Sequence, residues 1–241
     1  MVKFINKIAL SASLMAFSAL ANGSLITNGS FEQLTFADNS AAYGVVKNIA
    51  LQDYGTRNST WDVFYKLPGW TTSSGSGIEL QQNVVTSSQD GAHHVELDSY
   101  LNLGASNTVM TQTLNSLSVG SDYLLEFYYK PRTNVLNDNG INVFWYDAAL
   151  NFNNSMLADF SSESTSGLMP DWALQSVTFT AQAESMNLSF GSYGMQNTLG
   201  GLIDNVSLKQ TTSVPEPSML VMFAIGLGLL LARQRKWMQK G

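Results

Sequence analysis

Hydrophobic and polar residues alternate with a period of two through the middle of this chain. Val95 and Leu97 alternate with Glu96 and Asp98. The same spacing recurs at 124–129, 141–146, 177–180 and 188–190. In an extended strand a period of two sends neighbouring side chains to opposite faces. The pattern therefore predicts a series of short β-strands, each with one face toward a core.

Turn-forming residues separate these runs, and no long stretch has the 3.6-residue period of an amphipathic helix. Two of the interruptions are at 119–122 and 137–140, where Gly, Asn, Asp and Ser gather. Short strands with such turns between them indicate an all-β fold, a single antiparallel β-sandwich or barrel. The stretch 34–66 is the least regular, and it reads as a long loop with one or two short strands.

The N-terminal residues do not belong to this fold. Lys3 and Lys7 precede an apolar stretch at 8–20, and Ala19 and Ala21 provide small residues before a cleavage point. This order is that of a secretory signal peptide. We expect residues 1–21 to be removed and the exported chain to begin at Asn22.

The C-terminal residues form a second targeting segment. A linker at 211–217 ends in Val214-Pro215-Glu216-Pro217, an apolar segment follows at 218–232, and a basic tail occupies 233–241. The uncharged run 219–232 spans about 21 Å as a helix, which is short for a hydrocarbon core of about 30 Å. We expect 218–232 to be a hydrophobic transmembrane helix that holds the chain temporarily, with its basic tail in the cytoplasm.

The order of these three C-terminal parts resembles the PEP-CTERM sorting signal of Gram-negative bacteria. The resemblance implies recognition at Pro215-Glu216-Pro217 and processing by an exosortase, a membrane-embedded sorting protease. A plain C-terminal anchor is the alternative.

The folded part, 22–210, is strongly acidic. Between residues 22 and 213 there are six Lys and Arg against 17 Asp and Glu, since Glu216 is the one acid of the 18 that lies outside. Such a surface repels phosphate backbones, so we expect no nucleic-acid partner. The chain has no cysteine, which excludes disulfides and thiolate chemistry.

An ordered series of short motifs runs through the folded part. They are the segments at 25–32 (Leu-Ile-Thr-Asn-Gly-Ser-Phe-Glu), 67–70, 77–80, 90–98, 112–114 and 200–208 (Gly-Gly-Leu-Ile-Asp-Asn-Val-Ser-Leu). The series resembles the galactose-binding-like jelly rolls, a superfamily rich in carbohydrate-binding modules. The resemblance implies a jelly-roll sandwich whose first and last strands lie side by side. It also implies a structural Ca²⁺ held by Glu32 and Asp204, whose carboxylates suit a hard cation. The alternative is that both are ordinary acids at strand edges, or that Asp204 caps a turn.

His93 and His94 are the only histidines of the chain. Adjacent strand residues point to opposite faces, so the two rings cannot readily chelate one metal. His94 shares a face with Glu96 and Asp98, which raises a zinc site or an acid–base pair as a hypothesis. We favour a polar framework face that contacts solvent or a neighbouring loop, because no nucleophile or open metal position accompanies these groups.

The candidates for sugar stacking are the aromatic residues Trp61, Tyr65, Trp70, Tyr100, Trp145, Tyr146, Trp172 and Tyr193. We expect most of them in the core, Trp70 and Trp145 in particular, whereas Trp61, Tyr100 and Tyr193 lie in polar surroundings where an exposed ring would be informative.

The sequence as a whole favours an exported, non-enzymatic surface or matrix protein of a Gram-negative bacterium that binds extracellular polysaccharide. The alternatives are a purely structural biofilm or matrix protein without a glycan site and, third, an exopolysaccharide hydrolase.

Overall fold

We describe a computed structural model of the chain, which covers residues 23–34, 41–43, 60–99, 106–135, 138–150, 156–160 and 171–211. The predicted signal peptide, the Pro-Glu-Pro motif, the hydrophobic segment and the basic tail lie outside these residues. Within the described ranges there is no helix long and apolar enough to cross a membrane. Every regular element in the same ranges is a β-strand.

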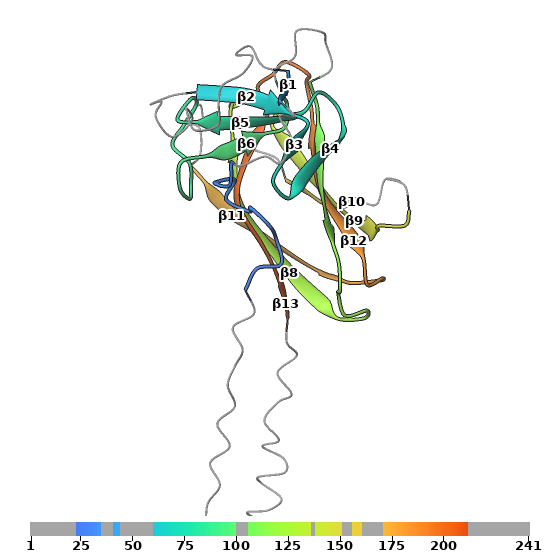
Figure 1. The fold of residues 1–241 in the computed structure, drawn as a ribbon. Helices are drawn as coiled ribbons and strands as arrows, with labels where there is room; N and C mark the ends of the chain where they lie inside the picture. Colours follow the sequence, from blue (N-terminus) through green and yellow to red (C-terminus); the bar gives the residue numbers. More distant parts are fainter. Residues whose placement is uncertain are drawn as a thin grey trace, which may run out of the picture.

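The strands form two antiparallel sheets that pack face to face (Figure 1). The seven-stranded sheet has the order β1-β2-β5-β6-β13-β8-β11. Its strands are β1 (Ala41–Tyr43), β2 (Thr60–Phe64), β5 (Ile78–Gln82), β6 (His94–Glu96), β13 (Gly201–Gln210), β8 (Asp122–Pro131) and β11 (Ala173–Thr180). The six-stranded sheet has the order β10-β9-β12-β7-β4-β3. Its strands are β10 (Met156–Phe160), β9 (Gly140–Asp147), β12 (Met186–Tyr193), β7 (Val109–Leu114), β4 (Trp70–Ser74) and β3 (Lys66–Leu67). The predicted all-β antiparallel sandwich is confirmed.

The core lies between the sheets and is centred on aromatic rings. Phe190 of β12 contacts Phe127 of β8 with ring centroids 5.0 Å apart, and it contacts Trp70 at 5.9 Å. Phe31 packs on the other side of Trp70 at 6.1 Å. Such tilted and edge-to-face pairs add to the free energy gained by burying the rings themselves. The expected burial of Trp70 and Trp145 is confirmed, since both are less than one-tenth exposed.

The start of the domain lies beside its last strand, as the resemblance implied. The Leu25 amide donates to the Leu208 carbonyl at 2.8 Å, and the Val206 amide donates to the Gly29 carbonyl at 2.9 Å. This first segment is a turn and not a strand, because Asn28 and Phe31 have positive φ angles of 54° and 59°. A Cβ on Gly29 would lie 1.9 Å from the Val206 carbonyl oxygen, so the close approach requires glycine.

The described ends of the domain therefore leave the sandwich together. Residues 24–26 run along the final residues of β13, and the Thr211 amide donates to the Asp122 carbonyl at the same end of the seven-stranded sheet. Figure 1 shows this end opposite to the one where β2, β5 and β6 lie. Residues 132–135 and the loop 194–200 lie toward that far end, where β8 ends and β13 begins.

Candidate functional site

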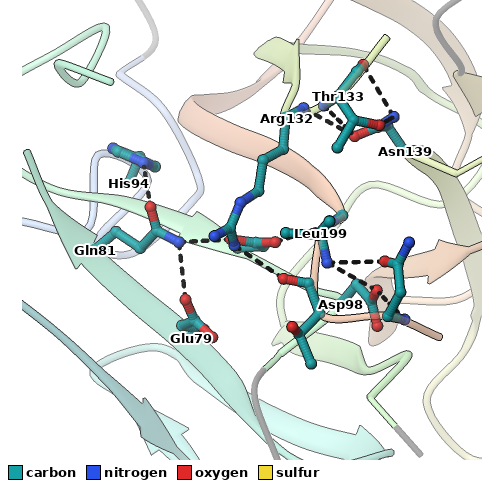
Figure 2. Close-up of polar contacts among 12 residues, drawn as sticks. Glu79, Gln81, His94, Asp98, Arg132, Thr133, Asn139 and Leu199 are labelled. Carbon is teal, nitrogen blue, oxygen red and sulfur yellow. Dashed lines mark hydrogen bonds and ion pairs between the residues drawn. The ribbon is translucent and has the colours of Figure 1, made fainter. Parts of the chain in front are cut away.

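The polar face that the sequence placed on His94 and Glu96 is a buried network on the outer side of β5 and β6 (Figure 2). Gln81 is its centre. Its side-chain amide nitrogen donates to Glu79 Oε1 at 2.8 Å and to Glu96 Oε2 at 2.5 Å. Its carbonyl oxygen lies 3.2 Å from His94 Nε2, and Ser88 Oγ lies 3.0 Å from His94 Nδ1. Since an amide oxygen only accepts, His94 carries its proton on Nε2 and accepts from Ser88.

Two carboxylates face each other in this network. Glu79 and Glu96 are directly opposite on neighbouring strands, and both are almost completely buried. Burial, reinforced by the nearby charge of Glu79, raises the pKa of Glu96 well above its usual range, while Arg132 acts in the opposite direction. Burial also lowers the pKa of His94 to about 3, so this ring is neutral at physiological pH.

Arg132, at the end of β8, supplies the counter-charge. Its Nη1 donates to Glu96 Oε2 at 2.5 Å and to the Thr198 carbonyl at 2.9 Å. Glu96 Oε1 accepts from the Gly200 amide at 2.7 Å. Since every one of these groups is held by its neighbours and Glu96 has no exposed surface, the network is arranged to fix the strands and the 197–200 loop rather than to meet a substrate.

Asp98 extends the same role toward that loop. Its Oδ2 accepts from the amides of Asn197 and Leu199 at 3.1 Å each, and Asn197 in turn donates to both oxygens of Asp138. The expectation that the face of His94, Glu96 and Asp98 contacts a neighbouring loop is confirmed. The expectation of contact with solvent is wrong for these residues, because all three are fully buried.

Glu32 and Asp204, the predicted calcium ligands, meet at one loop. Glu32 Oε1 accepts from the amides of Ala92 and His93 at 2.7 Å each, and Oε2 lies 2.9 Å from His93 Nδ1. Asp204 Oδ2 accepts from the amides of Gln89 and Asp90 at 2.8 and 2.9 Å. The two carboxylates thus hold the loop 89–93 at both ends.

These contacts leave little of either carboxylate for a metal ion. An ionised carboxylate offers about four acceptor positions. Glu32 uses three of them, and so does Asp204, whose Oδ1 also accepts from the Asn205 amide at 2.6 Å. Among the described residues no group of three or more His, Cys, Asp or Glu side chains is placed to hold a metal. The remaining ligands of the six to eight that Ca²⁺ takes would have to be carbonyls and water, so calcium stays a prediction.

Chelation tests this prediction. If Ca²⁺ joins Glu32 and Asp204, excess chelator should lower the Tm of the exported protein by several degrees, because an ion that binds only the folded state stabilises it. Glu32→Gln and Asp204→Asn should each abolish the response. Asp171→Asn should keep it, because the Asp171 carboxylate is exposed and contacts Lys130 instead of the loop 89–93. Equal melting curves with chelator and with added Ca²⁺ would mean that the backbone amides alone satisfy the two carboxylates.

The outer face of the six-stranded sheet has a different character. Met110, Leu188 and Trp145 point into the core, so their neighbours Thr111, Ser189 and Tyr146 point outward from β7, β12 and β9. Ser73 Oγ of β4 donates to Thr111 Oγ1 at 2.6 Å, and Thr111 Oγ1 lies 2.6 Å from Ser189 Oγ. Ser189 Oγ lies 3.3 Å from the Tyr146 hydroxyl. We call Ser73, Thr111, Ser189 and Tyr146 the hydroxyl row.

The hydroxyl row crosses four adjacent strands, and its β4 and β7 end is accessible to solvent. Ser73 is exposed, Thr111 is half-buried, and Ser189 and Tyr146 are buried. A second pair lies next to it, where Thr113 Oγ1 donates to Asn187 Oδ1 at 2.7 Å. All six side chains are neutral and carry hydroxyl or amide groups. The arrangement suits a ligand that both donates and accepts hydrogen bonds along its length.

The candidate stacking residues differ in how far their rings are exposed. Trp61 and Tyr193 are half-buried, and the Tyr193 ring lies so close to Gly140 that a Cβ there would come within 2.2 Å of it. Tyr100 lies outside the described residues. Trp172 is also half-buried, and it donates from Nε1 to the Ser87 carbonyl while its ring meets His94 edge-on. Tyr65 is 40% exposed, whereas the described rings of Trp61, Trp172 and Tyr193 are only partly accessible.

Sequence reasoning missed Arg132, Gln81 and the Ser and Thr residues of the hydroxyl row, whereas Tyr146 was a candidate only as a stacking ring. Glu79 stood in one of the quoted motifs, but nothing marked it as the partner of Glu96. The Ser and Thr residues of the row are common types at alternating positions. Their only sequence signal was their place on the polar side of strands whose other side is apolar.

Comparison with known families gives two matches that together cover most of the chain. The family model described as "Protein of unknown function (DUF642)" matches residues 24–209. The PEP-CTERM protein-sorting motif matches residues 213–236. The second match confirms the predicted sorting signal, and with it export to the cell envelope or surface and processing by an exosortase.

Curated relatives share only a segment with this chain. The "Multifunctional-autoprocessing repeats-in-toxin" of Vibrio vulnificus is 30% identical over 147 residues, which are 60% of this chain and 2% of the toxin. The halomucin of Haloquadratum walsbyi is 26% identical over 147 residues, which are 61% of this chain and 1% of that protein. The chain thus spans a few per cent at most of these relatives, and their activities do not transfer.

Among solved structures the likeness is one of general shape. A structure titled "CBM4 structure and function" has a TM-score of 0.32 at 16% identity, covering 77% of this chain and 99% of that one. TmCBM61 in complex with β-1,4-galactotriose has a TM-score of 0.38 at 15% identity, covering 70% and 100%. The K1 cleaved adhesin domain of Lys-gingipain from Porphyromonas gingivalis has a TM-score of 0.44 at 16% identity, covering 64% and 99%. TM-scores below 0.5 give no basis for transferring a ligand.

Proposed function

Because the chain belongs to the DUF642 family and carries a PEP-CTERM sorting motif, we propose that it is an exported, non-enzymatic protein that binds a neutral extracellular polysaccharide through the hydroxyl row. The observation that carries the proposal is the line of hydroxyls from Ser73 to Tyr146, which is accessible at Ser73 and Thr111 and continues into the buried Ser189 and Tyr146.

The chemistry of the row matches that of a sugar chain. Each sugar hydroxyl both donates and accepts, and so does each serine or threonine hydroxyl of the row. The row crosses β4, β7, β12 and β9, which neighbour one another at a spacing of about 4.8 Å. A saccharide lying across β4 and β7 would therefore meet the hydroxyls of Ser73 and Thr111, which the buried Ser189 and Tyr146 hold in place. The row is already ordered by its own hydrogen bonds, which lowers the entropy lost on binding.

Charge selects the class of polysaccharide. The folded part carries 17 acids against six cations, so a strongly anionic polymer is repelled at a distance. The hydroxyl row and its neighbours Thr113 and Asn187 carry no charge, so they offer no counter-ion for a carboxylate or sulfate group. Both features support a neutral glycan.

The geometry of the carboxylates supports a binding role over hydrolysis. A glycosidase needs an acid and a second carboxylate on the two sides of an accessible sugar bond. Glu79 and Glu96, which face each other across two strands, are instead buried beneath the network that Gln81 and Arg132 complete. Their position serves the scaffold.

Removing hydroxyls from the row tests the proposal. Ser73→Ala and Thr111→Val should each weaken binding of a neutral polysaccharide about fivefold, since one hydrogen bond contributes about 1 kcal/mol. The double variant should lose most of the retardation that the native protein shows in affinity electrophoresis through gels containing neutral glucans, galactans or xylans. Thr180→Val is the matched control, because it removes an exposed hydroxyl hydrogen bond to Asp122 on the other sheet.

Two results would contradict the proposal. One is retention of native affinity in the double variant, with its folding verified by Tm. The other is the absence of any neutral-glycan affinity in the native protein together with its retention in a biofilm matrix. The second result would favour the alternative, a structural matrix protein of a Gram-negative envelope in which the sandwich acts as a spacer.

A further inference from the structure

In the part of the chain that the structure describes, the two sheets have four edge strands, and three of them are short. At the edges of the seven-stranded sheet are β1, with three residues, and β11, with eight. At the edges of the six-stranded sheet are β10, with five residues, and β3, with two. An edge strand presents unpaired amides and carbonyls that another strand can pair with. Length alone makes β11 the edge with the most such groups.

The side chains of β11 give it none of the usual protection against pairing. Proteins block sheet edges with charged residues, proline or a bulge. Two of the shorter edges follow this rule, since β3 contains Lys66 and the pairing of β10 is interrupted by a shift of register. The sequence of β11 is Ala-Leu-Gln-Ser-Val-Thr-Phe-Thr, without charge, proline or glycine.

The strand is also regular and accessible. It pairs with β8 through all eight residues, from Ala173 opposite Tyr129 to Thr180 opposite Asp122, with no shift of register. In an antiparallel strand, alternate residues direct their amides and carbonyls to one side, so those of the remaining residues face the open edge. The outward side chains are solvent-exposed, and Leu174 is 53% exposed.

We propose that β11 pairs antiparallel with β11 of a second copy of this chain, which joins two seven-stranded sheets across a two-fold axis. Directly opposite residues of an antiparallel pair point to the same face, so with the two-fold axis at the centre of the strand the outward Ser176 faces Ser176 of the copy. A charged side chain there would meet an identical charge. The neutrality of β11 in a domain with 17 acids is what pairing with a copy requires.

The direction of the strands sets a condition on this pair. β13 and β11 are both antiparallel to β8, so they run parallel to each other. The two-fold axis reverses one copy, so the two β13 strands, and the chain that continues from residue 211 of each, point in opposite directions. Two copies held by their C-terminal segments in one membrane cannot both present that end to the membrane in this arrangement. The pair therefore forms after exosortase processing, or between copies on two facing surfaces.

Charge substitutions at Ser176 test the proposal. The processed protein, purified from the exporting host, should be a dimer at tens of micromolar in sedimentation velocity. Ser176→Lys and Ser176→Glu should each be monomeric, because the outward side chain at the centre of the pair then meets a like charge. An equimolar mixture of the two variants should restore the dimer by opposite-charge pairing, and Ser176→Thr should remain dimeric.

The mixture of Ser176→Lys and Ser176→Glu distinguishes charge repulsion from a loss of folding, because an unfolded variant would not restore the dimer. Tm measurements check that each variant is folded. A native protein that is monomeric at tens of micromolar overturns the proposal, as does a dimer that persists in Ser176→Lys. Neither outcome depends on glycan binding, so the test is separate from that of the proposed function.

Discussion

Replacing Arg132 with methionine is expected to lower the free energy of unfolding by about 3–5 kcal/mol at pH 7. Arg132 is the cation that contacts Glu96, whose side chain has no exposed surface. Methionine keeps much of the side-chain volume but leaves a buried carboxylate without its partner, beside the second carboxylate of Glu79. At this size of domain the Tm should fall by about 10 °C. Urea unfolding followed by circular dichroism measures both the midpoint and its slope.

The loss should depend on pH. The folded-state pKa of Glu96 is already raised, so the fold favours the protonated form of this acid. Stability linked to it is present below the usual pKa of 4.5 and is lost as pH rises through the folded-state value. Removing Arg132 raises that pKa further. The difference between variant and native protein should therefore shrink as pH falls from 8 toward 5. The cost of keeping His94 neutral as pH falls below 6.5 is common to both proteins and cancels in the difference.

Lys130→Met is the matched control. Lys130 lies two residues before Arg132 and pairs with Asp171 at 3.2 Å, but the Asp171 side chain is 89% exposed. A carboxylate in water loses little when its partner is removed, so the change should cost at most about 1 kcal/mol. Equal destabilisation by both substitutions, or a loss in Arg132→Met that does not vary with pH, would contradict the assigned role of Arg132.

The second large effect concerns the sorting signal. Replacing Pro215, Glu216 and Pro217 with alanine should leave nearly all of the protein as uncleaved, membrane-associated precursor, whereas the native protein should lose everything from about Ser218 onward. Proline fixes φ and lacks an amide donor, so the native tripeptide is kept out of a following helix and stays accessible to a protease. Alanine removes this restriction and the acidic group together.

The intact mass of protein purified from a host that has the exosortase shows whether the C-terminal segment has been removed. Alanine at Thr211 and Thr212, just before the matched motif, should leave processing unchanged and serves as the control. If mature native protein still contains residues 219–240, the segment is a permanent anchor. That finding would also remove the processing step on which pairing through β11 on a single membrane depends.

The outer faces of the two sheets differ in accessibility. On the seven-stranded sheet, Glu79, Gln81, Glu96 and Arg132 close the surface over β5 and β6 and fix the loops that follow. On the six-stranded sheet, neutral hydroxyls remain open along β4 and β7. The buried groups of His94, Glu96 and Asp98 therefore support the fold, and the accessible Ser and Thr residues of the hydroxyl row are the candidate binding surface.

The sequence by itself determined the features that depend on neighbouring residues. Alternation located β8, β9, β11 and β12, because each has one face in the core and one toward polar surroundings. The same alternation runs through β5, where Ile78 and Leu80 alternate with Glu79 and Gln81, but the sequence did not indicate that its polar side is buried as well. The sorting signal was also evident from sequence, because its order of acid, apolar run and basic tail is local.

Only the tertiary structure decided which distant residues meet. Arg132 and Glu96 are 36 residues apart, and Thr111 and Ser189 are 78 apart. Their contacts follow from the order of strands in each sheet, which single-sequence periodicity does not contain, because the same alternating strands fit many orders. For the same reason Glu32 and Asp204 could be proposed as partners from a family resemblance, but only the fold showed that both hold the loop 89–93 through its backbone amides.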